Sequence, residues 1–202
     1  FGTANSTAGK NLIDFASGIF NVIQLGPAGK TKSCDSSPYT STIFSNNPLF
    51  IDLKQLTTNE WENILSEKTF QEVVENNPNK DKAKTAYSYI CQAQTKALKE
   101  AFDKFKKSKS EKLKKEFEKY KKENKFWLEK DSLYEALSIE NENDYWPLWE
   151  SKSDKNLLNP QSIEEKLAAG ERIKELESKY ADDIEFYSFT QFVAFKQNEQ
   201  TK

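Results

Sequence analysis

The chain has 202 residues and a formal net charge of −2, and 36% of its residues are hydrophobic and 13% aromatic. This aromatic content argues against a disordered chain, and the near-neutral charge argues against a polyanionic partner. No apolar run reaches membrane length and the N-terminal residues lack the pattern of a signal peptide, so we expect no membrane association.

Histidine is absent, and the two cysteines are Cys34 and Cys91. The absence of histidine excludes Ser/His and Cys/His nucleophilic sites and metal sites built on imidazole. Two cysteines neither complete a zinc site nor make a disulfide framework. We therefore expect no metal, no cofactor and a reducing, cytoplasmic location. Chemistry that uses a pair of carboxylates stays open, because Asp and Glu together number 32.

Residues 1–56 are predicted to contain a helix, a strand and a long loop. Apolar residues recur at helical spacing over residues 9–17. The strand is predicted at residues 20–25, which end in an apolar run of the length of a buried strand. A polar, turn-rich loop comes next, over residues 26–48. Helix, tight turn and buried strand make half of a βαβ unit, so the predicted fold class is α/β, mostly α-helical.

Residues 57–180 are predicted to form a series of amphipathic helices. Apolar residues at three- and four-residue steps predict a long helix over residues 81–107 and a second helix over residues 111–125. Only a short turn separates the two, which favours an αα-hairpin.

Two sequences have the spacing of a capping box, in which a hydroxyl and a carboxylate stand three residues apart. The first pairs Thr57 with Glu60, and the second pairs Ser162 with Glu165. Each predicts the start of a helix.

Lysines outnumber acidic residues between residues 96 and 125. They either cover the solvent faces of two helices or form a nucleic-acid surface. We favour the first interpretation, because the one arginine of the chain, Arg172, lies elsewhere and the aromatic residues fall on the apolar stripe. The expectation is therefore no nucleic-acid partner.

Aromatic residues gather in two further segments. The sequence Tyr-Trp-Pro-Leu-Trp at residues 145–149 either stacks on sugar rings or plugs a small core, and we favour the core. Residues 183–197 are predicted to form the last helix, with apolar and aromatic residues nearly all round it. Such a helix is buried against several neighbours.

Three groups of short motifs occur in order along the chain. The first comprises LGPAG at residues 25–29, SPYTS at residues 37–41, NP at residues 47–48 and IDL at residues 51–53. The second comprises WLE and LYEAL within residues 127–137, and the third comprises FYSFTQF and FKQ within residues 186–197. Together they resemble the amylomaltases, the 4-alpha-glucanotransferases of the disproportionating-enzyme family. The resemblance covers nearly the whole chain but only the first part of such an enzyme.

The resemblance implies a partial (β/α)8 barrel and the helical insertion subdomain of that family. Residues 1–56 would be the partial barrel segment, with the strand and a sugar-facing loop. Residues 57–180 would be the insertion, and residues 181–202 would carry an aromatic helix back to the barrel.

The resemblance also implies which residues bind substrate. Ser37 and Tyr39 match the family's Ser-Pro-Tyr loop, whose tyrosine faces a sugar of the glucan. The alternative for Tyr39 is a packed side chain in an ordinary turn. The loop between Gly29 and Ser37 is longer here than in the family. No residue of this chain is expected to be catalytic, because the family's Asp and Glu lie in later barrel strands.

Three functional interpretations remain, and the first two have α-1,4-glucan or maltodextrin as the expected ligand. The first is the amino-terminal portion of a 4-alpha-glucanotransferase, inactive alone, with the remainder of the barrel as a partner if that exists as a separate or cleaved chain. The second is a stand-alone, non-catalytic binding or interaction protein derived from such an enzyme. The third is a basic helical nucleic-acid binder, which the lysine distribution disfavours.

Overall fold

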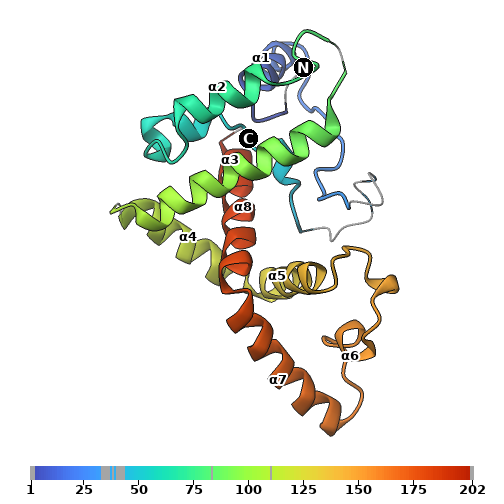
Figure 1. Ribbon diagram of the computed structural model, residues 1–202. Coiled ribbons are helices and arrows are strands. Elements are labelled where there is room, and N and C mark those ends of the chain that lie inside the picture. The colour runs from blue at the N-terminus through green and yellow to red at the C-terminus, as the bar shows by residue number, and fades with distance from the viewer. Residues whose placement is uncertain are drawn as a thin grey trace. The chain divides into compact units, whose positions relative to one another are not determined.

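The structure is a computed structural model that describes residues 3–32, 37, 39, 44–82, 84–109 and 111–200. Within these residues it contains helices and no β-strand (Figure 1). The α-helices are α1 (Thr7–Ser17), α2 (Glu67–Glu75), α3 (Tyr87–Lys107), α4 (Glu111–Glu123), α5 (Lys125–Glu140), α6 (Lys152–Lys155), α7 (Ile163–Lys179) and α8 (Ala181–Glu199). The 3₁₀ helices are η1 (Pro48–Phe50), η2 (Gln55–Thr57), η3 (Asn59–Trp61) and η4 (Trp146–Leu148). No helix among the described residues is long and apolar enough to cross a bilayer.

The mostly helical character is confirmed, but the predicted buried strand at residues 20–25 is wrong. Val22 is 83% exposed and Leu25 is 56% exposed. A strand is stable only when a neighbouring strand takes up its backbone hydrogen bonds, and the described part of the chain supplies none. An apolar run shows that a segment is suited to burial; it does not show that a partner strand is present.

The predicted first helix is confirmed as α1. The Ser6 hydroxyl caps it by accepting the Gly9 N–H at 3.1 Å. Gly9 is needed there, because a Cβ atom would lie 2.2 Å from the Thr3 carbonyl oxygen. The apolar residues of α1 are not covered, and Phe15 is 71% exposed.

The chain divides into two compact units. Unit 1 comprises residues 1–28, 46–118 and 190–202, and unit 2 comprises residues 29–45 and 119–189. The assignment of residues 57–180 to the family's insertion and of residues 181–202 to a return helix stays a prediction.

Aromatic rings connect four elements in unit 1. Phe105 of α3 meets Phe117 of α4 edge-on, with ring centroids 5.4 Å apart. Phe117 also contacts Phe192 of α8 at 5.4 Å, and Trp61 of η3 contacts Phe192 at 6.3 Å. The packing of α3 on α4 supports the predicted hairpin, and such aromatic pairs stabilise a core beyond their buried area.

Two buried glutamines of α8 bind the backbone of the segment that contains the NP and IDL motifs. Gln191 and Gln197 are both 0% exposed. Gln191 accepts the Asn46 N–H at 2.8 Å and donates to the Asn46 carbonyl at 3.1 Å. Gln197 accepts the Asp52 N–H at 2.8 Å and donates to the Asp52 carbonyl at 3.0 Å. Each side-chain amide thus satisfies both backbone groups of one residue, as a strand neighbour would.

A third buried glutamine holds the same segment from the side of α3. Gln94 donates to the carbonyls of Pro48, at 3.1 Å, and Ile51, at 2.8 Å. We call Gln94, Gln191 and Gln197 the glutamine clamp. It fixes residues 46–52 without any sheet, and it links the third motif group directly to the first.

Serine hydroxyls cap two of the later helices. Ser162 accepts the Glu165 N–H at 3.0 Å, which confirms the predicted start of α7. The capping box predicted at Thr57 is wrong, because the Thr57 hydroxyl donates to the Lys54 carbonyl at 2.8 Å within η2. Helix α2 is capped instead by Ser66, whose Oγ accepts the Thr69 N–H at 3.2 Å. A hydroxyl and a carboxylate three apart also fit a 3₁₀ turn, which explains the error.

Unit 2 has its own core between α5, α7 and the segment that comes after α5. Its buried members are Leu133, Leu137, Trp149, Leu157 and Leu176. Trp149 donates its indole N–H to the Asn143 carbonyl at 2.7 Å, whereas Trp146 is 48% exposed. The aromatic segment 145–149 therefore contributes Trp149 to the core, as favoured, and leaves Trp146 at the surface.

Arg172 joins three helices of unit 2. Its guanidinium makes a two-pronged pair with the buried Asp154 of α6, with N–O distances of 3.0 and 3.3 Å. It also contacts Glu175 at 2.8 Å and Glu140 of α5 at 3.6 Å. A hydrogen bond from Lys179 contributes most to lowering the pKa of Glu140, to about 2. The arginine is therefore fully engaged in holding α5, α6 and α7 together.

The last helix is buried on several sides, as predicted. The buried apolar residues of α8 are Tyr187, Phe189, Phe192, Val193 and Ala194. Phe195, at 42% exposure, faces water. The aromatic residues of this helix thus find most of their partners within the chain itself.

Candidate functional site

The two predicted substrate-binding residues, Ser37 and Tyr39, lie in unit 2. Tyr39 is 80% exposed, and its backbone N–H donates to the Ser37 hydroxyl at 3.3 Å. Their neighbours in the motif, Pro38 and Thr40, lie outside the described residues. The Tyr39 ring is thus exposed in this structure, and the roles of Ser37 and Tyr39 in substrate binding stay predictions.

The amino-terminal end of the loop is held on α5 and on the start of α8. The Lys30 ammonium forms an ion pair with Glu135 of α5. It also lies 5.4 Å from the centroid of the Tyr187 ring. Burial chiefly raises the pKa of Tyr187, and the carboxylates of Asp131 and Glu135 raise it further. The phenol therefore stays neutral beneath the lysine.

Lys32, two residues further, lies over two more aromatic rings. Its ammonium is 5.7 Å from the Tyr134 centroid and 5.9 Å from the Tyr145 centroid. Tyr134 donates its hydroxyl to the Asp144 carbonyl, and burial is the main cause that raises its pKa to about 12. These cation–π contacts are individually weak at exposed sites but add to the Lys30 pair.

The carboxyl-terminal end of the loop is held by Phe44. Its ring stacks on Trp127 of α5 with centroids 5.9 Å apart and an interplanar angle of 21°. It also meets Phe126 edge-on at 5.2 Å. Trp127 is itself oriented by a hydrogen bond from its indole nitrogen to the Asn124 amide oxygen at 3.0 Å. Both ends of the loop are thus attached to α5.

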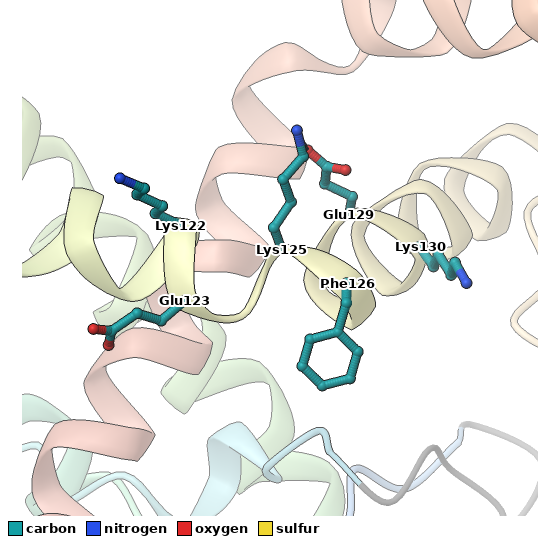
Figure 2. Close-up of a pocket in the computed structure, with 6 residues that line it drawn as sticks. All are labelled: Lys122, Glu123, Lys125, Phe126, Glu129 and Lys130. Carbon is teal, nitrogen blue, oxygen red and sulfur yellow. Dashed lines mark ion pairs between the residues drawn. The ribbon is translucent and has the colours of Figure 1, made fainter.

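A shallow hollow lies at the junction of α4 and α5 and is lined by Lys122, Glu123, Lys125, Phe126, Glu129 and Lys130 (Figure 2). Within it Lys125 pairs with Glu129 at 3.6 Å, and the Phe126 ring points away from this pair. The charged side chains that line it are exposed. Charged residues on an open surface of this kind do not hold a ligand in a defined orientation, so we do not assign the hollow as a site.

The lysine-rich helices carry ion pairs along their own surfaces. Lys104 pairs with Glu100 at 2.9 Å, and Lys119 pairs with Glu123 at 3.8 Å, each at helical i,i+4 spacing. This arrangement matches the solvated helix faces favoured from the sequence.

The carboxylates near the loop have structural roles where they are described. Asp52 accepts the Lys54 N–H at 3.0 Å and so caps a turn, and its own backbone is held by Gln197. Asp35 lies outside the described residues. Asp52 is therefore not a candidate nucleophile.

Sequence reasoning missed Lys30, Lys32 and Phe44 as residues that hold the loop. A weak signal was present, because two lysines and a phenylalanine flank an otherwise polar loop. Nothing in the spacing indicated that their partners would be Glu135, Trp127 and the nearby tyrosines.

The comparisons with known proteins agree with this picture. A family profile described as 4-alpha-glucanotransferase matches residues 1–202. A 4-alpha-glucanotransferase of Thermus thermophilus is 27% identical over 179 residues, which is 88% of this chain and 30% of the relative. A 4-alpha-glucanotransferase of Clostridium butyricum is 27% identical over 174 residues, or 86% of this chain and 31% of the relative.

A solved structure shares the fold. The amylomaltase of Streptococcus agalactiae in complex with acarbose superposes with a TM-score of 0.65 at 21% identity, covering 87% of this chain and 32% of that one. This chain thus spans about a third of the length of the relatives it matches. The chain belongs to the 4-alpha-glucanotransferase family and corresponds to the N-terminal region of such a protein.

Proposed function

We propose that the chain is the amino-terminal portion of a 4-alpha-glucanotransferase acting on maltodextrins, in which it contributes part of the glucan groove and none of the catalytic carboxylates. The observation that carries the proposal is Tyr39, an 80% exposed aromatic ring within a Ser-Pro-Tyr sequence that resembles the family's motif. An aromatic face offers apolar contact to the CH side of a pyranose, while hydroxyls such as that of Ser37 bind its OH groups.

The proposal includes a partial (β/α)8 barrel that begins in residues 1–56. A run of exposed apolar residues supports it, because such a surface is suited to burial against something outside the chain. The members of this run are Leu12, Phe15, Ile19, Phe20, Val22, Ile23 and Leu25. The remainder of the barrel is the proposed partner, in keeping with relatives about three times as long as the matched region. A cytoplasmic location belongs to the same proposal, because two cysteines do not make a disulfide framework.

A second candidate function is a stand-alone, non-catalytic binding or interaction protein derived from the enzyme. One observation favours it, because the aromatic residues of α8 that were expected to need the barrel are mostly buried within this chain. In that case the exposed run at residues 12–25 would contact a different protein.

An activity assay tests the main proposal. Incubated with maltotriose, the chain should release no glucose and form no longer maltodextrins, because both half-reactions need a nucleophilic carboxylate and an acid/base carboxylate about 5 Å apart. Measurable transglycosylation by the purified chain would contradict it.

A binding assay tests the site. Maltoheptaose should bind weakly, since one stacking ring and a few hydroxyl contacts are a small part of a groove. Tyr39→Ala should abolish that binding and leave the melting temperature unchanged. Tyr120→Ala is the control, because Tyr120 is 4% exposed and its loss should lower stability first. Binding that survives Tyr39→Ala would refute the assignment.

A further inference from the structure

We propose that Trp146 is a second carbohydrate-binding residue of the chain and that its ring stacks on a long α-1,4-glucan. The inference rests on the proposed function for the class of ligand, and its geometry comes from residues within unit 2. The aromatic segment 145–149 was expected either to stack on sugar rings or to plug a small core. Trp149, at 4% exposure, fills the core, and Trp146, at 48% exposure, is left for the first role.

The other three tryptophans of the chain are buried. Trp61, Trp127 and Trp149 are at most 6% exposed. The indole N–H groups of Trp127 and Trp149 donate to oxygens of this chain. Within the part of the chain that the structure describes, the Trp146 side chain makes no hydrogen bond and no ring contact. It therefore offers an apolar ring and an N–H donor to a molecule outside the chain.

Hydrogen bonds on both sides of Trp146 hold the backbone that carries it. The Trp149 indole donates to the Asn143 carbonyl at 2.7 Å. The Lys155 ammonium donates to the Pro147 carbonyl at 2.9 Å, within the 3₁₀ helix η4 that Trp146 begins. A ring on a fixed turn loses little conformational entropy when a ligand binds, so Trp146 is suited to stacking before any sugar arrives.

The chemistry around the ring fits a sugar chain. Aromatic faces contact the CH side of a pyranose, and N–H donors and carboxylates bind its hydroxyls. Besides the indole N–H, the segment offers the exposed carboxylate of Glu150, shortly after Trp146. A carboxylate repels an anionic ligand, so a neutral, polyhydroxylated chain such as a glucan is the ligand that fits.

The length of the glucan decides how much Trp146 contributes. A single stacking ring adds little affinity for a short oligosaccharide, because the loss of translational freedom on binding offsets most of the gain from one contact. A polymer that is held at the proposed Tyr39 site raises the effective concentration of its own sugar units near Trp146. Trp146 therefore increases the affinity for soluble starch and leaves the affinity for maltoheptaose unchanged.

Caesium quenching of tryptophan fluorescence tests the contact directly, because this hydrated ion collides with exposed indoles and not with buried ones. Trp146→Phe should remove most of the quenchable emission, since the other tryptophans are buried. Soluble starch should lower the quenching constant of the original chain by about twofold, because a stacked sugar covers one face of the ring. N-acetyltryptophanamide in the same solutions controls for viscosity. A quenching constant that starch leaves unchanged would overturn the proposal.

Electrophoresis through gels that contain soluble starch measures the contribution to affinity. Trp146→Ala should weaken starch binding about threefold to tenfold, while circular dichroism shows that the chain is still folded. Ile163→Ala is the matched control, because Ile163 is 77% exposed in the same unit and its loss should leave retention unchanged. An equal loss of retention in both variants, or no loss in either, would overturn the proposal.

Tyr39→Ala separates this inference from the proposed function. We expect this variant to weaken both starch retention and the protection of Trp146. If starch protected Trp146 equally well in Tyr39→Ala, the assignment of Tyr39 would fail and the Trp146 contact would stand. If starch were retained through Tyr39 while Trp146 stayed accessible to caesium, the Trp146 contact would fail and the proposed function would stand.

Discussion

The glutamine clamp gives a prediction whose magnitude comes from its geometry. Gln197→Ala removes two hydrogen bonds, at 2.8 and 3.0 Å, from a side chain with no solvent exposure. Each bond contributes about 1 kcal/mol net, and a backbone group left without a partner costs about 1–3 kcal/mol more. Because Asp52 is only half-buried, water partly replaces the lost amide. We therefore expect the free energy of unfolding to fall by about 2–3 kcal/mol.

Urea denaturation monitored by far-ultraviolet circular dichroism measures this loss. The control is Gln92→Ala, an exposed glutamine of α3, which should change the free energy of unfolding by less than about 0.5 kcal/mol. Gln197→Glu gives an independent check. It keeps an acceptor for the Asp52 N–H but sets a carboxylate against the Asp52 carbonyl, so it should destabilise more at neutral than at acid pH. A Gln197→Ala variant as stable as the control would refute the clamp.

Three further outcomes are expected. The indole N–H of Trp61 has no hydrogen-bond partner within the described part of the chain, so Trp61→Phe should cost about 1 kcal/mol less in urea denaturation than Trp149→Phe, which removes a hydrogen bond. Burial opposes ionisation of Glu100, but hydrogen bonds led by that of Lys104 lower its pKa from 4.5 to about 2. A carboxylate whose pKa is lowered in the folded state stabilises the fold at pH values above its ordinary pKa, and this stabilisation is lost as the pH falls. The melting temperature should therefore drop between about pH 5 and pH 2, and it should drop less in Glu100→Gln. We expect the chain to self-associate through its exposed apolar residues, and the double variant Phe15→Lys, Ile19→Lys should abolish this in sedimentation experiments; a chain that is a monomer at high concentration would count against the partial barrel.

The helices were predictable because their signals are local. Apolar residues at three- and four-residue steps set the course of α3 and α4, and a serine hydroxyl set the start of α7. Ser162 and Glu165 succeeded as a cap where Thr57 and Glu60 failed, although both have the same spacing. The two sites differ downstream, since a long apolar stripe continues only after Ser162.

The strand and the clamp were not predictable, because both depend on a partner distant in sequence. Residues 20–25 have strand composition but no neighbouring strand among the described residues. Gln94, Gln191 and Gln197 interrupt apolar stripes and so suggest surface positions, whereas their partners lie 43 to 145 residues away. The available signal was a polar residue on an otherwise apolar helix face. Such a residue indicates a buried hydrogen-bond partner, but it does not identify which residue that partner is.

The candidate site residues, Ser37 and Tyr39, were named from a short motif, and their role stays a prediction. The contacts of the residues that flank them could not be predicted. Lys30 and Phe44 carry no distinctive signal in the sequence, and their importance arises from where α5 places Glu135 and Trp127. Local sequence suggested the candidate binding residues, whereas contacts between residues distant in sequence could be seen only in the structure.

The assignment of the Tyr39 loop to the glucan groove is tested most directly by titrating the isotope-labelled chain with maltoheptaose and monitoring amide chemical shifts. We expect saturable shifts centred on Ser37 and Tyr39, with no turnover of the sugar during the measurement. The β-linked cello-oligosaccharide of equal length, as a control, should produce much smaller shifts. Shifts centred elsewhere, or none at saturating sugar, would contradict the assignment.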